Sequence, residues 1–172
     1  MSMSVCVVIK KHNELSEKQF NDIARLKDQH WPHGVESQKA WITKNFGEDD
    51  IHIILYLQDS PVAYASLNDI QCTIYSREET VFGLGGVCVA KSCQKQGLGK
   101  QIVECANRYI ATAEKPGLLL CHKELTGFYS LCGWEVINCE EVTVAGMPFA
   151  HLVMSFEKEY SKVDKLVISK NF

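Results

Sequence analysis

A short run of glycine, lysine and glutamine residues is the stretch of this chain best suited to chemistry. It reads Gln-Lys-Gln-Gly-Leu-Gly-Lys from Gln94 to Lys100, and apolar residues at helical spacing follow it. A helix begins with backbone N–H groups that have no partner inside it, and small residues at that point let an anion approach them. Lys95 and Lys100 add positive charge on either side of the two glycines. The stretch therefore predicts an anion site, above all for a phosphate or pyrophosphate.

Two common phosphate-binding patterns do not fit this stretch. A P-loop places serine or threonine after its Gly-Lys pair, whereas glutamine follows that pair here, and Gln94 stands where the first glycine of the pattern belongs. A dinucleotide fingerprint that begins at Gly83 would need a glycine at Cys88 and would lie inside a predicted strand. Neither pattern therefore explains the glycines.

A third pattern fits, and it is carried by two blocks of sequence. Gln94-Lys-Gln-Gly-Leu-Gly99 resembles the Gln/Arg-x-x-Gly-x-Gly/Ala signature of the GNAT N-acetyltransferases, and Val87-Cys-Val89 matches the strand that precedes it in that family. The block from Gly117 to Trp134 is similar to the family's later strand and helix and ends in Phe-Tyr-x-x-x-Gly-Trp. Two ordered blocks are stronger than one glycine pattern. The chain also resembles, more distantly, the aminoglycoside 2′-N-acetyltransferases.

The resemblance implies acetyl-CoA as co-substrate and no metal. Val87 and Val89 would offer main-chain hydrogen bonds to the pantetheine arm, and the amide of Cys88 or Val89 would polarise the thioester carbonyl. His122 stands where the family frequently has an asparagine that bonds pantetheine, although a role in ending its strand stays open. The expected cofactor site comprises Val87, Cys88, Val89, Gln94, Lys95, Gln96, Gly97, Leu98, Gly99, Lys100, His122 and Tyr129.

Acetyl transfer to an amine needs a proton donor for the departing thiolate and a base for the amine. Tyr129 stands where the family commonly has its general acid, and the alternative is a core tyrosine packed on the cofactor arm. The family's usual strand glutamate corresponds to Gly85 or a neighbouring glycine, so the base is expected to be a water relay or a histidine, His30 or His33. These two histidines also suit a packed loop beside Trp31. Cys88 and Cys121 lie in apolar runs without a base nearby in the sequence, which disfavours a thiol nucleophile.

The expected function is transfer of acetyl from acetyl-CoA to a primary amine of a small molecule, by direct attack in a ternary complex. Two alternatives stay open: acetylation of a peptide or protein amine, and a non-catalytic acyl-CoA-binding regulatory module. The missing strand carboxylate is the feature that supports the second alternative. The one protein–protein assembly that we consider is a homodimer.

The predicted elements give an α+β fold over nearly the whole chain. It has a mixed, mostly antiparallel sheet with a splayed parallel strand pair, flanked by helices, as in GNAT proteins. The predicted strands are Val5–Lys11, Ile51–Leu57, Val62–Tyr75, Thr80–Ala90, Leu118–Cys121, Trp134–Val144 and Phe149–Phe156. The predicted helices are Glu17–Lys27, Ser37–Phe46, one that begins at Gly97 to Gly99, and Glu124–Leu131.

Local signals set several of these boundaries. Ser16 and Gln19 form a capping box, and the stretch from Asp28 to Gly34, with its proline and glycine, is expected to break the first helix. The second helix is expected to turn Ala40, Trp41 and Ile42 inward. The tail from 157 to 172 is expected to form an extra strand or an interface arm.

Bulk properties point to one ordinary globular domain, residues 1–172. The chain has 172 residues, of which 46% are hydrophobic and 23% charged, with a formal net charge of -3. This charge gives no footprint for nucleic acid. The apolar run from Val5 to Ile9 is too short for a signal segment or a membrane span, so we expect a cytoplasmic protein without a membrane partner. The eight cysteines are scattered, which favours reduced thiols.

Overall fold

The computed structural model describes residues 4–172, and these form two compact units. The N-terminal unit comprises the chain up to Asn68 together with Gly86–Ala106, and the C-terminal unit comprises Asp69–Gly85 and Asn107–Phe172. Strands β3 (Ser60–Ile74) and β4 (Arg77–Val89) and helix α3 (Leu98–Ala113) each contribute to both units. Within residues 4–172, no helix combines the length and apolar character needed to cross a bilayer.

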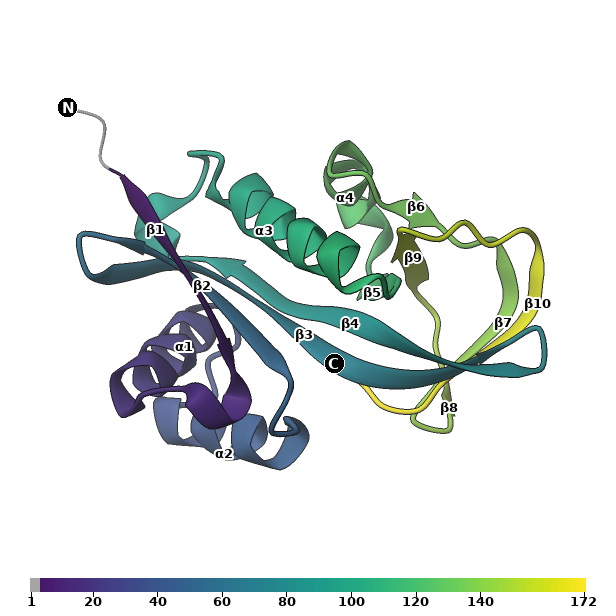
Figure 1. Cartoon of the computed structure of the whole chain (residues 1–172), viewed down its shortest axis with the longest axis horizontal. Coiled ribbons are helices and arrows are strands. Elements are labelled where there is room, and N and C mark those ends of the chain that lie inside the picture. The colour runs from purple at the N-terminus through teal and green to yellow at the C-terminus, as the bar shows by residue number, and fades with distance from the viewer. Residues whose placement is uncertain (1–3) are drawn as a thin grey trace. The chain divides into compact units, whose positions relative to one another are not determined.

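The N-terminal unit is a hairpin-based sheet covered by two helices. Strand β1 (Val5–Lys11) pairs antiparallel with β2 (Ile51–Leu57), and β2 pairs antiparallel with the first part of β3. Figure 1 shows helices α1 (Glu17–His30) and α2 (Val35–Asn45) beside each other on one side of these strands. The bounds of β1 and β2 are those predicted, because each is a local apolar run between turn residues.

Helix α1 begins as predicted and ends later. The Ser16 hydroxyl accepts from the Gln19 amide at 3.1 Å, and the Gln19 side chain accepts from the Ser16 amide at 3.0 Å, which is the predicted capping box. The helix then continues to His30, so the break expected from Asp28 onward is wrong for its first three residues. Pro32 restricts only the residue directly before it, and that residue, Trp31, is where helical geometry is lost.

Helix α2 presents a different face from the one predicted. Ile42 is fully buried, as expected, but Trp41 is 41% exposed and Ala40 is exposed as well. The inward residues are Gln38, Ile42 and Phe46, which follow one another at four-residue spacing. The buried Gln38 amide is satisfied because it donates to the carbonyl of Trp31. Because the polar residue Gln38 lies on the inner face, the spacing of apolar residues alone did not predict which face of α2 is buried.

The C-terminal unit is built on a mixed sheet. Its remaining elements are β5 (Gly117–Cys121), α4 (Thr126–Leu131), β6 (Glu135–Val136), β7 (Cys139–Val144), β8 (Met147–Pro148), β9 (Leu152–Phe156) and β10 (Val163–Ile168). The strand order is β6-β9-β5-β4-β3-β10-β7-β8. Strands β4 and β5 pair in parallel, as do β7 and β10, whereas β5 with β9 and β3 with β10 are antiparallel. The predicted α+β mixed sheet is confirmed.

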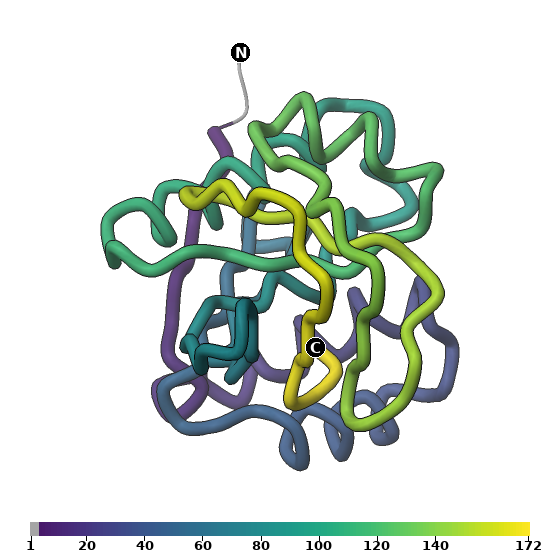
Figure 2. The backbone as a smooth tube through the Cα atoms, turned by 90° about the vertical axis from the view of Figure 1, so that its right-hand side faces the viewer, coloured from purple at the N-terminus to yellow at the C-terminus, as the bar shows by residue number. Residues whose placement is uncertain are grey.

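The tail from 157 to 172 contains the last strand, β10. Strand β10 lies between β3 and β7, and Figure 2 shows this C-terminal segment running alongside the preceding green strand. Of the two expectations for residues 157–172, the extra strand is therefore confirmed. The two long strands predicted from 134 to 156 are wrong in their extent: the first divides into β6 and β7, and β9 begins only at Leu152.

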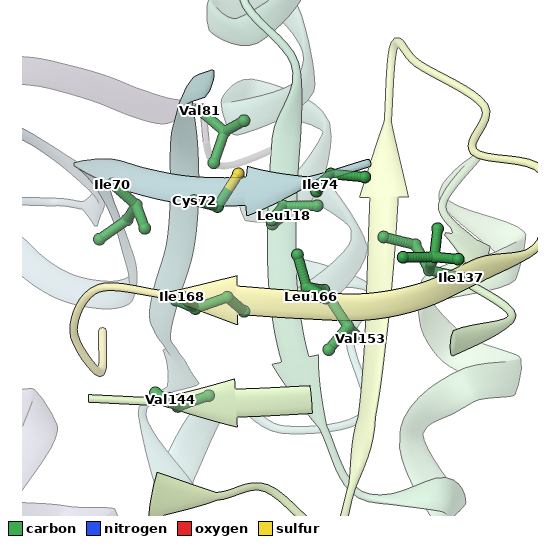
Figure 3. Close-up of a cluster of buried hydrophobic side chains, with 11 residues drawn as sticks. Ile70, Cys72, Ile74, Val81, Leu118, Ile137, Val144, Val153, Leu166 and Ile168 are labelled. Atoms are coloured by element: carbon green, nitrogen blue, oxygen red, sulfur yellow. The ribbon is translucent and has the colours of Figure 1, made fainter. Parts of the chain in front are cut away.

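Apolar side chains from these strands form the core of the C-terminal unit (Figure 3). The cluster includes Ile70 and Cys72 from β3, Leu118 from β5, and Leu166 and Ile168 from β10, all 3% exposed or less. Burial of each large aliphatic side chain stabilises the fold by about 1.5–3 kcal/mol. Residues of the tail are thus part of the core that holds β3, β4 and β5 in place.

Candidate functional site

The glycine-lysine stretch forms a loop that opens a helix, as predicted. Lys95 and Gly97 have positive φ angles of 62° and 80°, and α3 starts at Leu98. The Gly97 carbonyl accepts from the Gln101 amide at 3.1 Å, which makes Gly97 the residue that caps the helix. The amides of residues 98 to 100 therefore precede the first N–H that bonds within the helix. A Cβ built on Gly97 would meet no atom within 4 Å, so the loop is open there.

The electrostatics of this loop favour an anion. No acidic residue lies in the first turn of α3, and the positive end of the helix dipole adds to the charges of Lys95 and Lys100. Lys100 lies 3.7 Å from the Glu104 carboxylate, with both side chains well exposed. Such a pair in water contributes little and leaves the ammonium able to rearrange toward a ligand. The arrangement is suited to binding phosphate oxygens.

Strand β4 continues beyond its ladder with β5 and leads directly to this loop. The ladder joins Phe82, Gly83 and Leu84 to residues 117–119, whereas β4 extends to Val89. Gly86 has a positive φ of 62°, a conformation that glycine adopts without strain, directly before residues 87–89. The structure thus brings together in one unit the strand end and the anion loop that the sequence assigned to a cofactor.

Of the two histidines proposed as bases, His30 lies at the strand end and His33 does not contact it. His30 is the last residue of α1, not a loop residue, and its Nε2 lies 2.6 Å from the Val89 carbonyl oxygen. Because a carbonyl can only accept, Nε2 carries the proton in this contact. His33 is exposed in the turn, where its amide donates to the Trp31 carbonyl at 2.8 Å.

The absence of a strand carboxylate at position 85 has a steric cause. A Cβ on Gly85 would lie 2.7 Å from the main-chain carbon of Phe172, and a Cβ on Gly83 would lie 2.6 Å from the Phe172 ring. Real Cβ atoms do not approach other atoms so closely, and glycine is the residue that permits such close backbone contact. The strand therefore has no room for a glutamate at position 85 while Phe172 lies there.

A buried lysine, Lys27, lies beside Gly86, the next glycine of the strand. Nothing in the sequence had marked it as a functional residue. A Cβ on Gly86 would lie 3.7 Å from Nζ of Lys27 and 3.1 Å from the Tyr64 ring. Lys27 is 7% exposed, and burial lowers the pKa of its amine, although the nearby Cys88 partly opposes that shift. Its only sequence signal was helical spacing, four residues after the buried Ile23.

Three polar side chains of the N-terminal unit form a hydrogen-bonded chain that the sequence also missed. Nδ1 of His12 lies 3.0 Å from Nε2 of His52, whose Nδ1 lies 2.7 Å from the Tyr64 hydroxyl. His52 is fully buried and its ring stacks on Phe46 at 4.5 Å between centroids. Burial, followed by the proximity of His12 and Lys27, lowers the pKa of His52 to about 3. His52 is thus neutral at physiological pH.

Acidification should destabilise the protein through His52. Unfolded, this imidazole binds a proton below about pH 6.5, whereas the folded chain resists protonation down to about pH 3. Within that window the free energy of unfolding should fall by roughly 1 kcal/mol per pH unit from this group. Denaturant unfolding of the wild type and His52→Asn between pH 7 and pH 5 measures the difference. His151→Asn, at an exposed histidine, is the control; equal slopes for wild type and His52→Asn would contradict the assignment.

Tyr129 and His122 lie in the C-terminal unit. Tyr129 is in α4 and is 9% exposed, and burial, followed by the proximity of Cys121 and Cys132, raises the pKa of its phenol to about 12. The phenol is therefore protonated at neutral pH. His122 follows β5, is exposed, and has its ring 3.9 Å from that of His151. Both residues stay predictions as site residues.

The cysteines do not provide a ready nucleophile. All eight are free thiols, and burial raises the pKa of Cys88 to about 12 and also raises the pKa of Cys121. The thiolate is the reactive form, so these two groups are poorly reactive at neutral pH. In the described part of the chain, no three side chains of histidine, cysteine, aspartate or glutamate gather in a way that would hold a metal ion.

The solved structures with a similar fold include enzymes of acyl transfer. An acyl-CoA N-acyltransferase from Pseudomonas aeruginosa has a TM-score of 0.66 and 22% identity, over 88% of this chain and 99% of that one. A GNAT family acetyltransferase from Brucella melitensis, in complex with acetyl-CoA, has a TM-score of 0.61 and 12% identity, over 96% of both chains. At these identities the likeness establishes the fold alone.

A third structure bears on the aminoglycoside resemblance. It is an aminoglycoside 6′-N-acetyltransferase complexed with coenzyme A, with a TM-score of 0.64 and 14% identity, over 87% of this chain and 96% of that one. Its regiochemistry is 6′ and not 2′, so the specific likeness to 2′ enzymes gains no support. No curated protein matched the chain.

The family itself is established by sequence. A family model described as an acetyltransferase (GNAT) domain matches residues 48–136, a span from β2 to β6 that is just over half of the chain. It includes the strand end, the anion loop and the Phe-Tyr-x-x-x-Gly-Trp block. This chain therefore belongs to the GNAT acetyltransferase family.

Proposed function

We propose that this chain transfers an acetyl group from acetyl-CoA to a primary amine of a small molecule, by direct attack in a ternary complex. The observation that carries the proposal is the continuity of one strand end with one anion loop. Residues 87–89 lead through a short turn into the loop at 94–97 and the first turn of α3. A long carrier with a phosphorylated end and a thioester end matches this order of groups.

The pyrophosphate is assigned to the loop. Amides of residues 98–100 would donate to its oxygens, and Lys95 and Lys100 would balance its charge. Gln94, Gln96 and the open position at Gly97 complete the loop in this proposal. These groups bind an anion and do not recognise a base or a sugar. The loop therefore contributes affinity, and specificity for the carrier depends on contacts with its other parts.

The pantetheine arm is assigned to the end of β4. Main-chain groups of Val87 and Val89 would pair with its amides as an added strand does. The amide of Cys88 or Val89 would donate to the thioester oxygen, where negative charge develops during attack. Because His30 already donates to the Val89 carbonyl, binding of the arm there requires that carbonyl to accept a second hydrogen bond or His30 to turn away.

The route is direct attack and not a covalent enzyme intermediate. A relay through Cys88 would need its thiolate, and the raised pKa of that thiol opposes this. Tyr129 is proposed as the general acid that gives a proton to the CoA thiolate, and its raised pKa keeps the phenol protonated until that step. His122 is retained as a candidate for hydrogen bonding to pantetheine.

One observation favours a second candidate, a non-catalytic acyl-CoA-binding module. Gly85 has no room for the carboxylate that serves as base in many relatives. Turnover separates the two candidates. The purified chain would be incubated with acetyl-CoA and panels of small amines and peptides, with release of free CoA as the readout. We expect release with at least one small amine. Release with peptides alone would move the acceptor to the peptide class, and binding without release would favour the module.

A further inference from the structure

The amine of Lys27 lies beside the strand end, at ordinary contact distance from the position that a Cβ at residue 86 would take. Its Nζ lies 3.7 Å from the Cβ position of Gly86, the residue directly before Val87. The amine lies over the Trp41 ring at 4.5 Å from its centroid, and the Trp31 ring is 5.8 Å away. Trp31 and Trp41 are 42% and 41% exposed, whereas Lys27 is 7% exposed. A buried amine is thus held between the strand and two indoles that reach the surface.

The surroundings of this amine favour its neutral form. Among residues 4–172, no carboxylate forms an ion pair with Lys27. The titratable groups that act on it are the thiol of Cys88 from β4 and the imidazole of His52 from β2, and the ring of Tyr64 from β3 also lies against Gly86. Helix α2 contributes the indole of Trp41. The thiol of Cys88 and the phenol of Tyr64 are neutral because their pKa values are raised, and the imidazole of His52 is neutral because its pKa is lowered. Lys27 therefore lacks the partner that usually keeps a buried ammonium charged.

We propose that Lys27 is the general base of the reaction, and this inference rests on the proposed function. Its neutral amine takes one proton from the ammonium of the acceptor at the end of β4. The acceptor amine then attacks the thioester carbon, so that a C–N bond forms and the C–S bond breaks. Tyr129 protonates the departing CoA thiolate, and the proton lost by the new amide nitrogen returns to Tyr129. Lys27 finally releases its proton to solvent, which balances the reaction.

A positioned amine suits this step because its strength as a base can match that of the acceptor. A carboxylate near its ordinary pKa of about 4 would remove a proton from an alkylammonium only at large cost. A lysine whose charged form is destabilised by burial takes the same proton more nearly at equilibrium. The alternative is that the two indoles stabilise a charged Lys27, which would then only fill space.

Two substitutions and one titration distinguish these roles. Lys27→Met keeps the length and removes the amine, and Lys27→Arg keeps a charge that does not titrate. We expect each to lower kcat/KM by at least about 100-fold near neutral pH, to remove the wild type's own ionisation from the pH profile, and to leave the acetyl-CoA Kd within about threefold. Lys18→Met, on the same helix, removes an exposed ammonium that pairs with the buried carboxylate of Asp22; it is the matched control and should retain wild-type rates.

The amine can also be observed without any acceptor. A ¹⁵N-lysine NMR titration of the full chain should show that Lys27 loses its proton at a lower pH than the exposed lysines do. A pKa equal to that of Lys18, a Lys27→Met rate within threefold of wild type with an unchanged pH profile, or acetyl-Lys27 in the resting protein by mass spectrometry would overturn the proposal. Wild type that turns over no amine would instead overturn the proposed function, since the titration reports on Lys27 alone.

Discussion

Replacement of Tyr129 with phenylalanine is expected to lower kcat by about 10²- to 10⁴-fold, the usual contribution of a positioned general acid. The substitution removes one hydroxyl and keeps the ring that packs edge-on against Phe128 at 5.0 Å. Because the phenol of Tyr129 is protonated well above neutral pH, it can act as a donor throughout the working range. The acetyl-CoA Kd should stay within about threefold, since the lost proton matters only as the thiolate forms.

The control for this substitution is a second tyrosine of the same unit. Tyr109→Phe keeps the contact of the ring with Phe82 at 5.8 Å and should leave kcat unchanged. Steady-state kinetics at several pH values, with the Kd measured separately, decides the matter. If Tyr129→Phe retains wild-type kcat on an acceptor that the wild type acetylates, the acid is another group.

Reversal of both loop charges, Lys95→Glu with Lys100→Glu, is expected to weaken acetyl-CoA binding by about 10- to 100-fold. Each glutamate would replace an attraction to the pyrophosphate with a repulsion at the start of α3, where the helix dipole makes the loss largest. The effect should shrink as ionic strength rises, because both side chains are in water. Calorimetric titration at low and high salt measures it.

A charge-matched variant separates the loop from net charge. Lys44→Glu with Lys162→Glu changes the formal charge by the same amount, at exposed positions in α2 and before β10. It should bind acetyl-CoA as the wild type does. Equal losses in the two double variants would mean that the loop has no special place in binding.

Much of the fold follows from local sequence. Strand β1, strand β2 and the start of α1 depend on apolar runs and on one hydrogen-bonded cap, which neighbouring residues determine. The loop at 94–100 is equally local, because a glycine cap and a lysine in left-handed geometry suffice to open α3. Predictions of this kind were confirmed because few distant residues contribute to them.

The predictions were wrong where residues that are distant in the sequence determine which face is buried or where a strand begins. Trp41 has an apolar side chain in a helix and was expected inside, yet Gln38 takes the inner position because the Trp31 carbonyl accepts its amide. Strand β9 begins only at Leu152 because its pairing with β5 sets its start, with Leu152 opposite Cys121. A single run of apolar residues does not contain that information.

The site divides in the same way. Sequence motifs indicated the residues that we assign to the carrier, because the proposed contacts use main chain and short loops. The proposed base could not be predicted from the sequence. The glycine at position 85 is explained by the close approach of Phe172, and Lys27 stands out only because its amine lies beside Gly86 in the folded chain. Lysine in an amphipathic helix is ordinarily a surface residue, and burial that lacks a charged partner is a property of the folded chain.

The most direct test is an amide NMR titration of the full chain with acetyl-CoA. The account predicts saturable binding, with the largest shifts at the amides of residues 87–89 and 97–100, and the loss of those shifts in the Lys95→Glu, Lys100→Glu variant. Saturable binding that leaves these amides unchanged, or no binding at millimolar acetyl-CoA, would contradict it.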